Sequence, residues 1–576
     1  MIRKLLRYVK QYTLLSLLAP FFVAIEVVLE VFIPFTMAKI IDVGVIELGG
    51  DVNYILTQGG IMILLTLSSL LCGAMAGICA ARAGVGFTKN LRAAVFANVQ
   101  NFSFANIDKF STASLITRQT TDMTNVQNAY MMSLRMLVRG PLMLVGATIM
   151  AASINPTLSI VFAVAIPVIA VLMVIVGRLS FPRFKRMFKK YDDMNASVQE
   201  NLIGIRVVKA FVREDHEIVK YKKASEGLRS AQFKAEFLLV LGQPMLSFII
   251  FGCTVAVIAI GGVMSINGTM GVGELSSFIS YVAQALMSML MLMMVFMMMV
   301  ISKESAERIV EVIDEKPTVS DENADPDLKV ADGSIEFSNV SFGYKNKDVL
   351  ALEGIDFTIE AGQTVGVIGG TGSSKSTLVQ LIPRLYDVTD GQVSVGGHDV
   401  RDYKIKELRE SVAMVLQKNV LFSGTIKENL KWGNPDATDE EIEEAAKSAA
   451  AHDFITSFPK GYETDLGQGG VNVSGGQKQR LCIARALLKK PKIMILDDST
   501  SAVDTATDKK IREALANLKD MTVIIIAQRI ASVMNADKII VMDDGRVNAI
   551  GTHDELMETN AIYREVYESQ QRGTEE

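Results

Sequence analysis

Six long apolar segments alternate with polar ones along the first half of the chain. Each holds about 20 or more mostly apolar residues, the length that a helix needs to cross the hydrocarbon core of a bilayer. The pattern therefore predicts six membrane-spanning helices, near residues 13–38, 56–81, 133–154, 157–177, 238–262 and 275–301.

The positions of the positive charges predict how these helices are oriented. Lys and Arg are missing from residues 40–81, 140–177 and 238–302, whereas the segments between these windows are long and basic, as in residues 181–193. Because cytoplasmic loops of membrane proteins carry an excess of Lys and Arg, we expect the basic segments inside the cell. The predicted protein is multi-pass in the cytoplasmic membrane, with both termini cytoplasmic.

The N-terminus and the long loops are expected to be helical. The first residues are basic, as in a secretory signal, but the apolar run over residues 13–38 is too long and lacks a small-residue cleavage site. We therefore expect an amphipathic helix and then a retained span. Residues 82–132 and 178–237 show helical periodicity with mixed charge, so they are expected to extend the membrane helices into the cytoplasm.

The composition changes after the sixth span. Residues 314–332 are acidic, contain Pro317 and Pro326 and have no apolar periodicity, which is typical of a linker. The residues that follow have the composition of a soluble α/β domain. The predicted organisation is therefore a transmembrane domain over residues 1–313, a linker, and a second domain over residues 333–576.

Charge and cysteine content exclude two classes of function. The net charge is −5 and no basic arm or stripe stands out, so nucleic-acid binding is not expected. The cysteines lack the spacing of metal ligands, and we expect them to be buried, reduced thiols. They are Cys72, Cys79, Cys253 and Cys482.

Polar residues inside the spans are candidates for a substrate cavity. Glu26 and Glu30 lie four residues apart in the first span and therefore share a helix face. Carboxylates at membrane depth are costly and usually face a cavity or a partner. Two interpretations are equally compatible with this pair. The carboxylates form a site for a cationic substrate or a proton, or they form an interhelical hydrogen-bonded pair or face an outer water-filled cleft. Gln284 and Ser288, also four apart, are expected to line the cavity from the sixth span.

The sixth span is also rich in methionine, a flexible and polarizable residue that recurs on promiscuous binding surfaces. A drug-binding wall is one interpretation. The methionines cover all faces of the helix, however, so most of them are expected to meet lipid or packing neighbours. They are Met287, Met289, Met291, Met293, Met294, Met297, Met298 and Met299.

A glycine-rich turn between a predicted strand and a predicted helix indicates a phosphate site. Residues 369–376 match G-x-x-x-x-G-K-[ST], except that Ser374 takes the second glycine position. The pattern needs backbone N–H groups aimed at phosphate, a lysine for the β- and γ-phosphates and a hydroxyl for Mg²⁺. The predicted ATP-binding residues are Gly369, Gly370, Thr371, Gly372, Ser373, Ser374, Lys375, Ser376 and Thr377, with Ser376 as a Mg²⁺ ligand.

Two further motifs lie downstream of this turn. Residues 492–498 form a predicted buried strand that ends in acids, where Asp497 would hold Mg²⁺ through water. A second cluster of amides at a helix start can bind an anion; it consists of Ser474, Gly475, Gly476 and Gln477. Together with the glycine-rich turn, these motifs resemble the ATP-binding cassette (ABC) superfamily. The resemblance covers essentially the whole chain and is most specific for bacterial multidrug and lipid exporters.

The resemblance implies the fold and further roles. The fold is an all-α, six-helix transmembrane domain with long cytoplasmic extensions, followed by an α/β P-loop nucleotide-binding domain with a helical subdomain. Tyr344 resembles the aromatic residue that stacks on adenine, Gln417 the glutamine that reaches Mg²⁺ and the attacking water, and Asp504 the D-loop aspartate. Residues 205–215 resemble a coupling loop, so the ends of both cytoplasmic loops are expected to dock on nucleotide-binding domains.

The family arrangement also implies a partner. ATP lies between two nucleotide-binding domains, with the P-loop from one and the signature motif from the other. A working unit therefore needs a second half-transporter, and residues 474–477 would complete the partner's site.

Three residues of this chain's own ATP site depart from the family pattern. Asp498 stands where the family has the glutamate general base, Gln528 where it has the switch histidine, and Ser374 where it has a P-loop glycine. Asp498 is one methylene shorter than glutamate, and a positioned general base is worth roughly 10²–10⁴-fold in rate. The pattern resembles the degenerate subunit of heterodimeric exporters, with an intact signature motif for the partner's site.

The predicted function is ATP-driven export of hydrophobic or amphipathic compounds, with a multidrug exporter favoured. A heterodimer is favoured over a homodimer. One alternative is a lipid flippase, which the lack of a strong basic cavity residue disfavours. The other is a non-transporting, ATP-gated regulator, which the intact signature motif disfavours.

Overall fold

The computed structural model describes residues 1–344, 349–498, 504–518 and 520–575, and the chain forms two compact units. Unit 1 contains Met1–Val99 and Ala113–Asp314, and unit 2 contains Gln100–Thr112 and Glu315–Glu576. The short segment around residue 106 therefore belongs to unit 2, although it lies between two membrane helices in the sequence.

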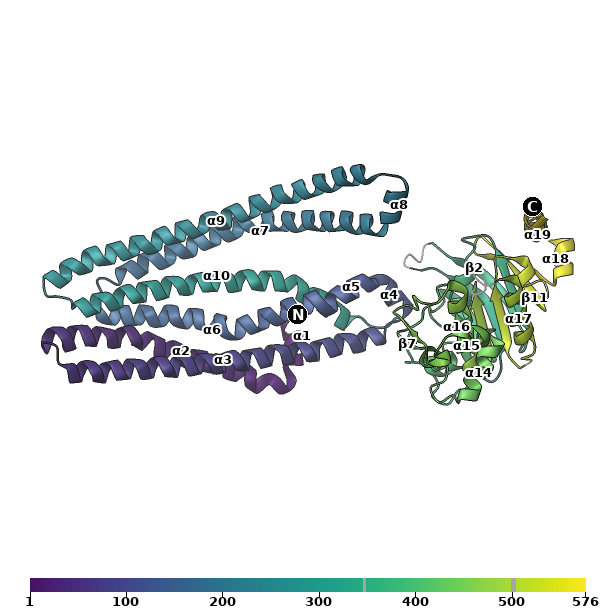
Figure 1. Ribbon diagram of the computed structural model, residues 1–576, viewed down its shortest axis with the longest axis horizontal. Helices are drawn as coiled ribbons and strands as arrows, with labels where there is room; N and C mark the ends of the chain where they lie inside the picture. Colours follow the sequence, from purple (N-terminus) through teal and green to yellow (C-terminus); the bar gives the residue numbers. More distant parts are fainter. Residues whose placement is uncertain (345–348, 499–503, 519, 576) are drawn as a thin grey trace. The chain divides into compact units, whose positions relative to one another are not determined.

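Unit 1 is entirely helical. Among the described residues, six helices are long and apolar enough to span a membrane, which confirms the predicted number. The long helices are α2 (Thr13–Lys39), α3 (Val52–Gln100), α6 (Met123–Ile154), α7 (Ile160–Ile203), α9 (Glu214–Ile266) and α10 (Val272–Asp314) (Figure 1). The short ones are α1 (Ile2–Leu6), α5 (Thr112–Thr117) and α8 (Ile205–Ala210).

Several helices continue well beyond their apolar stretches, as the loop periodicity predicted. The third span is predicted near residues 133–154, and α6, which contains it, begins at Met123 within the loop that was expected to be helical. Hydropathy detects only the part of a helix that lies in hydrocarbon, whereas backbone hydrogen bonding continues through mixed-charge sequence. Irregular turns of π-helix lie at Ile40–Glu47 and Arg118–Asp122, where one extra residue enters the helical repeat.

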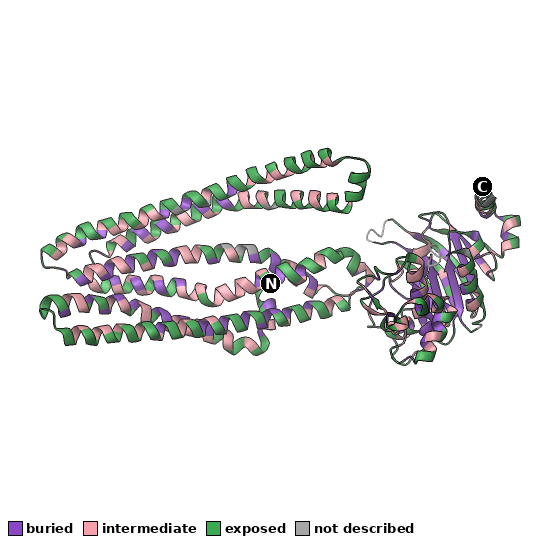
Figure 2. Ribbon diagram, viewed as in Figure 1, coloured by how far each residue is buried: buried purple, intermediate pink, exposed green. Residues whose placement is uncertain are grey.

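The helices of unit 1 pack in two groups. Helices α2, α6 and α10 pack against one another, and α7 pairs with α9 over much of its length (Figure 1). Gly140 on α6 allows a close approach to α10, because a Cβ there would lie 2.7 Å from Leu292. Many residues on the outer faces are exposed and apolar, as expected for helices surrounded by lipid (Figure 2).

Unit 2 is built on two main sheets. The first has the order β12-β11-β3-β10-β9-β6, parallel except for β12, and the second is antiparallel with the order β2-β1-β4-β5. The strands are β1 (Ile335–Phe342), β2 (Leu352–Ile359), β3 (Thr364–Gly369), β4 (Asp390–Val395), β5 (His398–Asp399), β6 (Val412–Val415), β9 (Ile493–Asp497), β10 (Thr522–Ile526), β11 (Lys538–Asp543) and β12 (Arg546–Gly551). A small separate pair is β7 (Gly424–Thr425) and β8 (Asp465–Leu466).

The parallel strands are buried on both faces, which explains their nearly continuous apolar sequences (Figure 2). Helices cover the sheets and form the helical part of this α/β unit. They are α11 (Lys375–Leu381), α12 (Ile405–Ser411), α13 (Ile426–Leu430), α14 (Asp439–Ser448), α15 (His452–Ser457), α16 (Gly475–Leu488), α17 (Thr505–Ala516), α18 (His553–Thr559) and α19 (Ala561–Glu575).

Unit 2 also includes α4 (Phe104–Phe110), from the predicted first cytoplasmic loop. Ser103 and Asn106 form a capping box at its start, and the Asn106 amide donates to Glu315 Oε1 at 2.9 Å and to the Lys316 carbonyl at 3.0 Å. The acidic segment that follows α10 is also hydrogen-bonded to the rest of this unit, because Asp321 Oδ1 accepts a hydrogen bond from the Ile405 N–H at 2.8 Å. Both segments are thus held by specific hydrogen bonds within unit 2.

The four cysteines are free thiols, as expected, but their burial differs from the prediction. Cys79 and Cys482 are buried, whereas Cys72 and Cys253 are only half-buried. The latter two lie on membrane helices, where lipid rather than protein can cover an apolar side chain.

Candidate functional site: a P-loop ATP site and a membrane cavity

The glycine-rich turn lies between β3 and α11, at the carboxyl end of a central parallel strand. Gly369 must be glycine, because a Cβ there would overlap the carbonyl oxygen of Met542. Gly372 has φ +89°, and Ser374 has φ +67° directly before the first residue of α11. The position that the family fills with glycine therefore has a left-handed backbone here, which costs a non-glycine residue roughly 1–2 kcal/mol.

Side chains around this turn form a cradle that fits a nucleotide phosphate and Mg²⁺. The Lys375 ammonium donates to the carbonyls of Gly369 and Gly370 at 2.9 and 2.8 Å, across the turn itself. Ser376 Oγ donates to Asp497 Oδ1 at 2.8 Å, so the two predicted Mg²⁺ ligands are adjacent hard oxygens. Bound Mg²⁺ would neutralise phosphate charge at this point. Burial lowers the pKa of Lys375 and raises the pKa of Asp497.

Asp498 is held by two amide side chains. It follows β9 directly, and Gln528 follows the neighbouring parallel strand β10, whose Ile526 is paired with Asp497. Gln528 Nε2 donates to Asp498 Oδ2 at 2.9 Å, and Gln417 also hydrogen-bonds this carboxyl group. Burial raises the pKa of Asp498, and these hydrogen bonds oppose that shift. The three residues assigned to hydrolysis by resemblance thus lie together.

The signature residues are placed at the start of α16. Ser474 Oγ accepts from the Gln477 N–H at 3.3 Å, and Gln477 Oε1 accepts from the Ser474 N–H at 2.9 Å. This capping box orders the free amides of the first turn. Asp504 caps α17 by accepting from the Thr507 N–H at 2.9 Å, while the five residues before it lie outside the described part of the chain. No hydrogen bond among the described residues joins residues 474–477 to the P-loop.

Tyr344, the predicted adenine platform, belongs to an aromatic group. Its hydroxyl is hydrogen-bonded to Thr377 Oγ1 at 2.9 Å, and its ring lies edge-on to Tyr386 with centroids 5.3 Å apart. Tyr386 in turn donates to Asp108 of α4 at 2.8 Å. The predicted adenine site is therefore two side chains away from a segment that the sequence assigns to a cytoplasmic loop. The end of the second loop, α8, belongs to unit 1.

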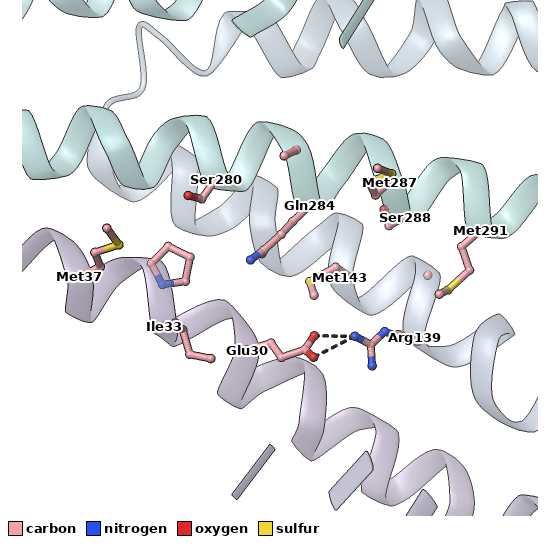
Figure 3. A pocket seen from close by; sticks show the side chains of 13 residues that line it. Glu30, Ile33, Met37, Arg139, Met143, Ser280, Gln284, Met287, Ser288 and Met291 are labelled. Carbon is pink, nitrogen blue, oxygen red and sulfur yellow. Dashed lines mark hydrogen bonds and ion pairs between the residues drawn. The ribbon is translucent and has the colours of Figure 1, made fainter. Parts of the chain in front are cut away.

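Three of the four predicted cavity residues of the membrane helices line one cavity. A cavity of about 560 Å³ is lined by residues of α2, α6 and α10, including Glu30, Gln284 and Ser288 (Figure 3). Glu26 is buried and does not line this cavity. Arg139 of α6 donates one Nη to Glu26 and the other to both oxygens of Glu30, at 2.9 and 2.7 Å.

Two residues of these sites were missed from the sequence. Arg139 contradicts the expectation that no strong basic residue lines the cavity. It lies inside the predicted third span, just before the window over residues 140–177 that has no Lys or Arg. An arginine within an apolar segment is itself a signal for a carboxylate partner. Tyr386 was also missed. Its link to α4 depends on tertiary contacts, and only the spacing of Phe104 and Asp108, one helical turn apart, hints at a shared docking face.

Comparisons with known proteins agree with this architecture. The chain matches the family described as ABC transporter transmembrane region over residues 16–289 and the ABC transporter family over residues 352–501. It is 37% identical over 568 residues to the uncharacterised ABC transporter ATP-binding protein YfiB of Bacillus subtilis (strain 168), covering 99% of this chain and 98% of that protein. YgaD of the same organism, named as a candidate multidrug export ATP-binding/permease protein, is 35% identical and covers 83% of each chain.

A solved structure is similar over nearly the whole length. The structure of a bacterial Atm1-family ABC exporter with ATP bound superposes with a TM-score of 0.80 at 27% identity, covering 98% of each chain. A six-helix membrane unit followed by a P-loop α/β unit with a signature motif defines an ABC exporter half-transporter. The chain belongs to the ABC transporter family and is a multi-pass membrane protein whose ATP-binding domain implies ATPase activity coupled to transport.

Proposed function

We propose that this chain is one subunit of a heterodimeric exporter that moves hydrophobic or amphipathic compounds, including drugs, out of the cell. Its own P-loop site binds ATP with Mg²⁺ but hydrolyses it slowly, and its signature motif completes the faster site of the partner. The observation that carries the proposal is the 2.9 Å hydrogen bond from Gln528 Nε2 to Asp498 Oδ2.

This hydrogen bond bears on the two groups that would activate the attacking water. A general base must reach that water within about 2.6–3.2 Å. Asp498 has one methylene less than the glutamate of the family, and its carboxyl group accepts from Gln528 and Gln417. A neutral amide can donate to this carboxylate, but it cannot carry a charge or a proton as a histidine can. Slow hydrolysis follows from both features.

The signature motif supports service in a working ATPase. The capping box of Ser474 and Gln477 leaves the first N–H groups of α16 free to meet an anion. An intact motif favours service in a working ATPase over a purely regulatory role. The provisional assignment of YgaD to multidrug export supports the same class of function for this chain.

The test compares ATPase activity of the purified chain with that of the chain co-expressed with a candidate partner, each with and without lipophilic cations. We expect turnover only from the pair, and a change of rate with the cations. Two variants of this chain sharpen the result within the pair. Ser474→Ala should abolish most turnover, whereas Lys375→Ala should leave most of it.

Other outcomes point to the alternatives. Fast turnover by the chain alone would support a homodimer and contradict the degenerate site. Equal losses from both variants in the pair would also contradict it. Turnover that responds to lipids but to no drug would indicate a flippase, and turnover by the pair that responds to neither would indicate an ATP-gated regulator.

A further inference from the structure

The cavity between α2, α6 and α10 has a charge imbalance. Among the described residues, the charged side chains that line it are Glu30 and Arg139. Arg139 also pairs with Glu26, so a single guanidinium faces two carboxylates. When all three are ionised, these three side chains together carry one net negative charge; Arg135, one turn before Arg139 on α6, lies beside Gly77 of α3 and does not line the cavity.

The two carboxylates have different positions. The Glu26 side chain is 11% exposed and lies against α3, where Gly73 leaves room for its carboxylate. The Glu30 side chain is 25% exposed, and both of its oxygens face Arg139 across the cavity (Figure 3). Glu26 is therefore the fixed counterion of Arg139, and Glu30 is the carboxylate that a bound molecule can approach.

The uncharged polar groups of the cavity favour a ligand that brings hydrogen-bond donors. Gln284 extends from α10 toward α2 (Figure 3), and its Oε1 is buried without a hydrogen-bond partner in the described part of the chain. A buried acceptor of this kind costs free energy until a donor reaches it. Ser280 and Ser288 already donate their hydroxyls to the carbonyls of Ser276 and Ala285, which leaves their oxygens as acceptors.

The rest of the wall is apolar and deformable. Met37, Met143, Met287 and Met291 line the cavity from three helices (Figure 3). Thioether side chains adapt to flat or irregular ligands and make favourable contacts with aromatic rings. A volume of about 560 Å³ lies within the range of pockets that hold drug-sized molecules.

From these observations we infer that the cavity binds one amphipathic monocation carrying an N–H donor, with Glu30 as its counterion and Gln284 as its acceptor. Glu30 then divides its two oxygens between Arg139 and the ligand, while Glu26 keeps Arg139 neutralised. An anionic ligand would have to displace both carboxylates from Arg139. The inference rests on the proposed export function and names the substrate class of its cavity.

Binding is measured on the full-length chain in lipid nanodiscs without nucleotide, by fluorescence against empty nanodiscs. The probes are rhodamine 6G, a monocation with N–H donors, neutral nile red, and anionic 8-anilinonaphthalene-1-sulfonate. Glu30→Gln should weaken rhodamine 6G binding by at least about tenfold, because a charged hydrogen bond is lost, and leave nile red unchanged. Gln284→Leu should weaken rhodamine 6G several-fold.

Two variants serve as controls. Glu30→Asp keeps the charge and should keep the preference for rhodamine 6G, and Glu236→Gln on α9 removes an exposed carboxylate that does not line the cavity and should change nothing. Unchanged rhodamine 6G affinity in a folded Glu30→Gln variant would overturn the inference. So would tighter binding of the anion than of the cation by the unmodified chain.

The two proposals fail separately. If the cation binds through Glu30 but no cation changes the ATPase rate of the pair, the export function fails and the cavity assignment stands. If the pair responds to compounds of every charge and Glu30→Gln changes no affinity, the cavity assignment fails alone.

Discussion

Tyr386 donates a hydrogen bond of 2.8 Å from its hydroxyl to Asp108 Oδ2. This hydrogen bond joins Tyr386 to α4. The Tyr386 ring also contacts the ring of Tyr344, the predicted adenine platform. Burial and the nearby Asp108 carboxylate raise the pKa of Tyr386, so the phenol stays protonated and keeps donating throughout the neutral range. We expect this contact to couple nucleotide binding at Tyr344 to the segment before α5.

We expect Tyr386→Phe to weaken this coupling with little change in ATP affinity. One hydrogen bond to a charged group is worth roughly 1.5–3 kcal/mol, so the effect should be measurable without unfolding the unit. The measurement is stimulation of the ATPase by transported compounds in the pair. Tyr403→Phe is the matched control, because its buried hydroxyl donates to the Val395 carbonyl at 2.7 Å, away from α4. Equal stimulation in wild type and Tyr386→Phe would exclude this route.

The second prediction concerns restored hydrolysis. Asp498→Glu combined with Gln528→His supplies the longer carboxylate and the ionisable partner that the site lacks. Since a positioned general base contributes roughly 10²–10⁴-fold, the purified chain alone should gain ATPase activity of at least that lower order. Asp498→Asn with Gln528→His is the control that lacks the base and should stay inactive. If the double variant gained nothing, the cause of slow hydrolysis would lie elsewhere.

Ser374 gives a third prediction. Its φ of +67° is unfavourable for serine, so Ser374→Gly should stabilise the P-loop unit by up to about 1 kcal/mol, the strain being partly offset by the greater entropy of glycine in the unfolded chain. Ser374→Val should destabilise it, since a β-branched residue tolerates this conformation least. Thermal unfolding of the full-length chain, followed through unit 2, measures both. Equal melting temperatures for the three forms would show that the strain is absent in solution.

Cys482 gives a prediction for pH dependence. It is buried, and burial raises the pKa of its thiol. A raised pKa lowers the thiolate fraction at neutral pH, so native Cys482 should react with maleimide more slowly than a free thiol. Its rate should keep rising with pH beyond the range where an ordinary thiol is fully ionised. The measurement uses a chain with Cys72, Cys79 and Cys253 replaced by alanine, and denaturant should abolish the protection. Rapid native labelling at neutral pH would contradict the burial.

The sequence was sufficient for the features that depend on local order along the chain. The apolar runs predicted the number of membrane helices. The predicted strand, the glycine-rich turn and Lys375 predicted the position of the P-loop, because these signals lie close together in the sequence. The sequence also showed that Ser374 takes the place of a P-loop glycine, and its φ of +67° lies in the left-handed region that favours glycine. The roles of the site residues in binding and hydrolysis remain predictions.

Features that depend on the meeting of distant segments were not predictable in this way. From the sequence, the role of Glu26 and Glu30 on α2 was undecided between binding a cationic ligand, binding a proton and pairing with another helix. No nearby residue in the sequence identifies Arg139 as the partner of both carboxylates. Hydropathy could not locate the start of α6, because apolar sequence ends near the membrane surface whereas this helix begins at Met123, in mixed-charge sequence. The contact of Asp108 with Tyr386 joins residues 278 positions apart.

Substitution of Gly73 tests whether the position of the Glu26 carboxylate depends on the missing side chain at this point of α3. A Cβ at this position would lie 2.9 Å from Glu26 Oε1, so Gly73→Ala should push the carboxylate away from Arg139 and destabilise the membrane unit by roughly 1–3 kcal/mol. Gly60→Ala lies on the same helix with nothing within 4 Å of the added Cβ, and it should be neutral or slightly stabilising through helix propensity. The fraction of folded protein that survives heating in nanodiscs distinguishes the two. With Glu26 displaced, Glu30 would become the main counterion of Arg139 and would be less available to a cationic ligand. Gly73→Ala should therefore also bind rhodamine 6G more weakly. Retention of both stability and cation binding in Gly73→Ala would mean that Glu26 does not fix Arg139.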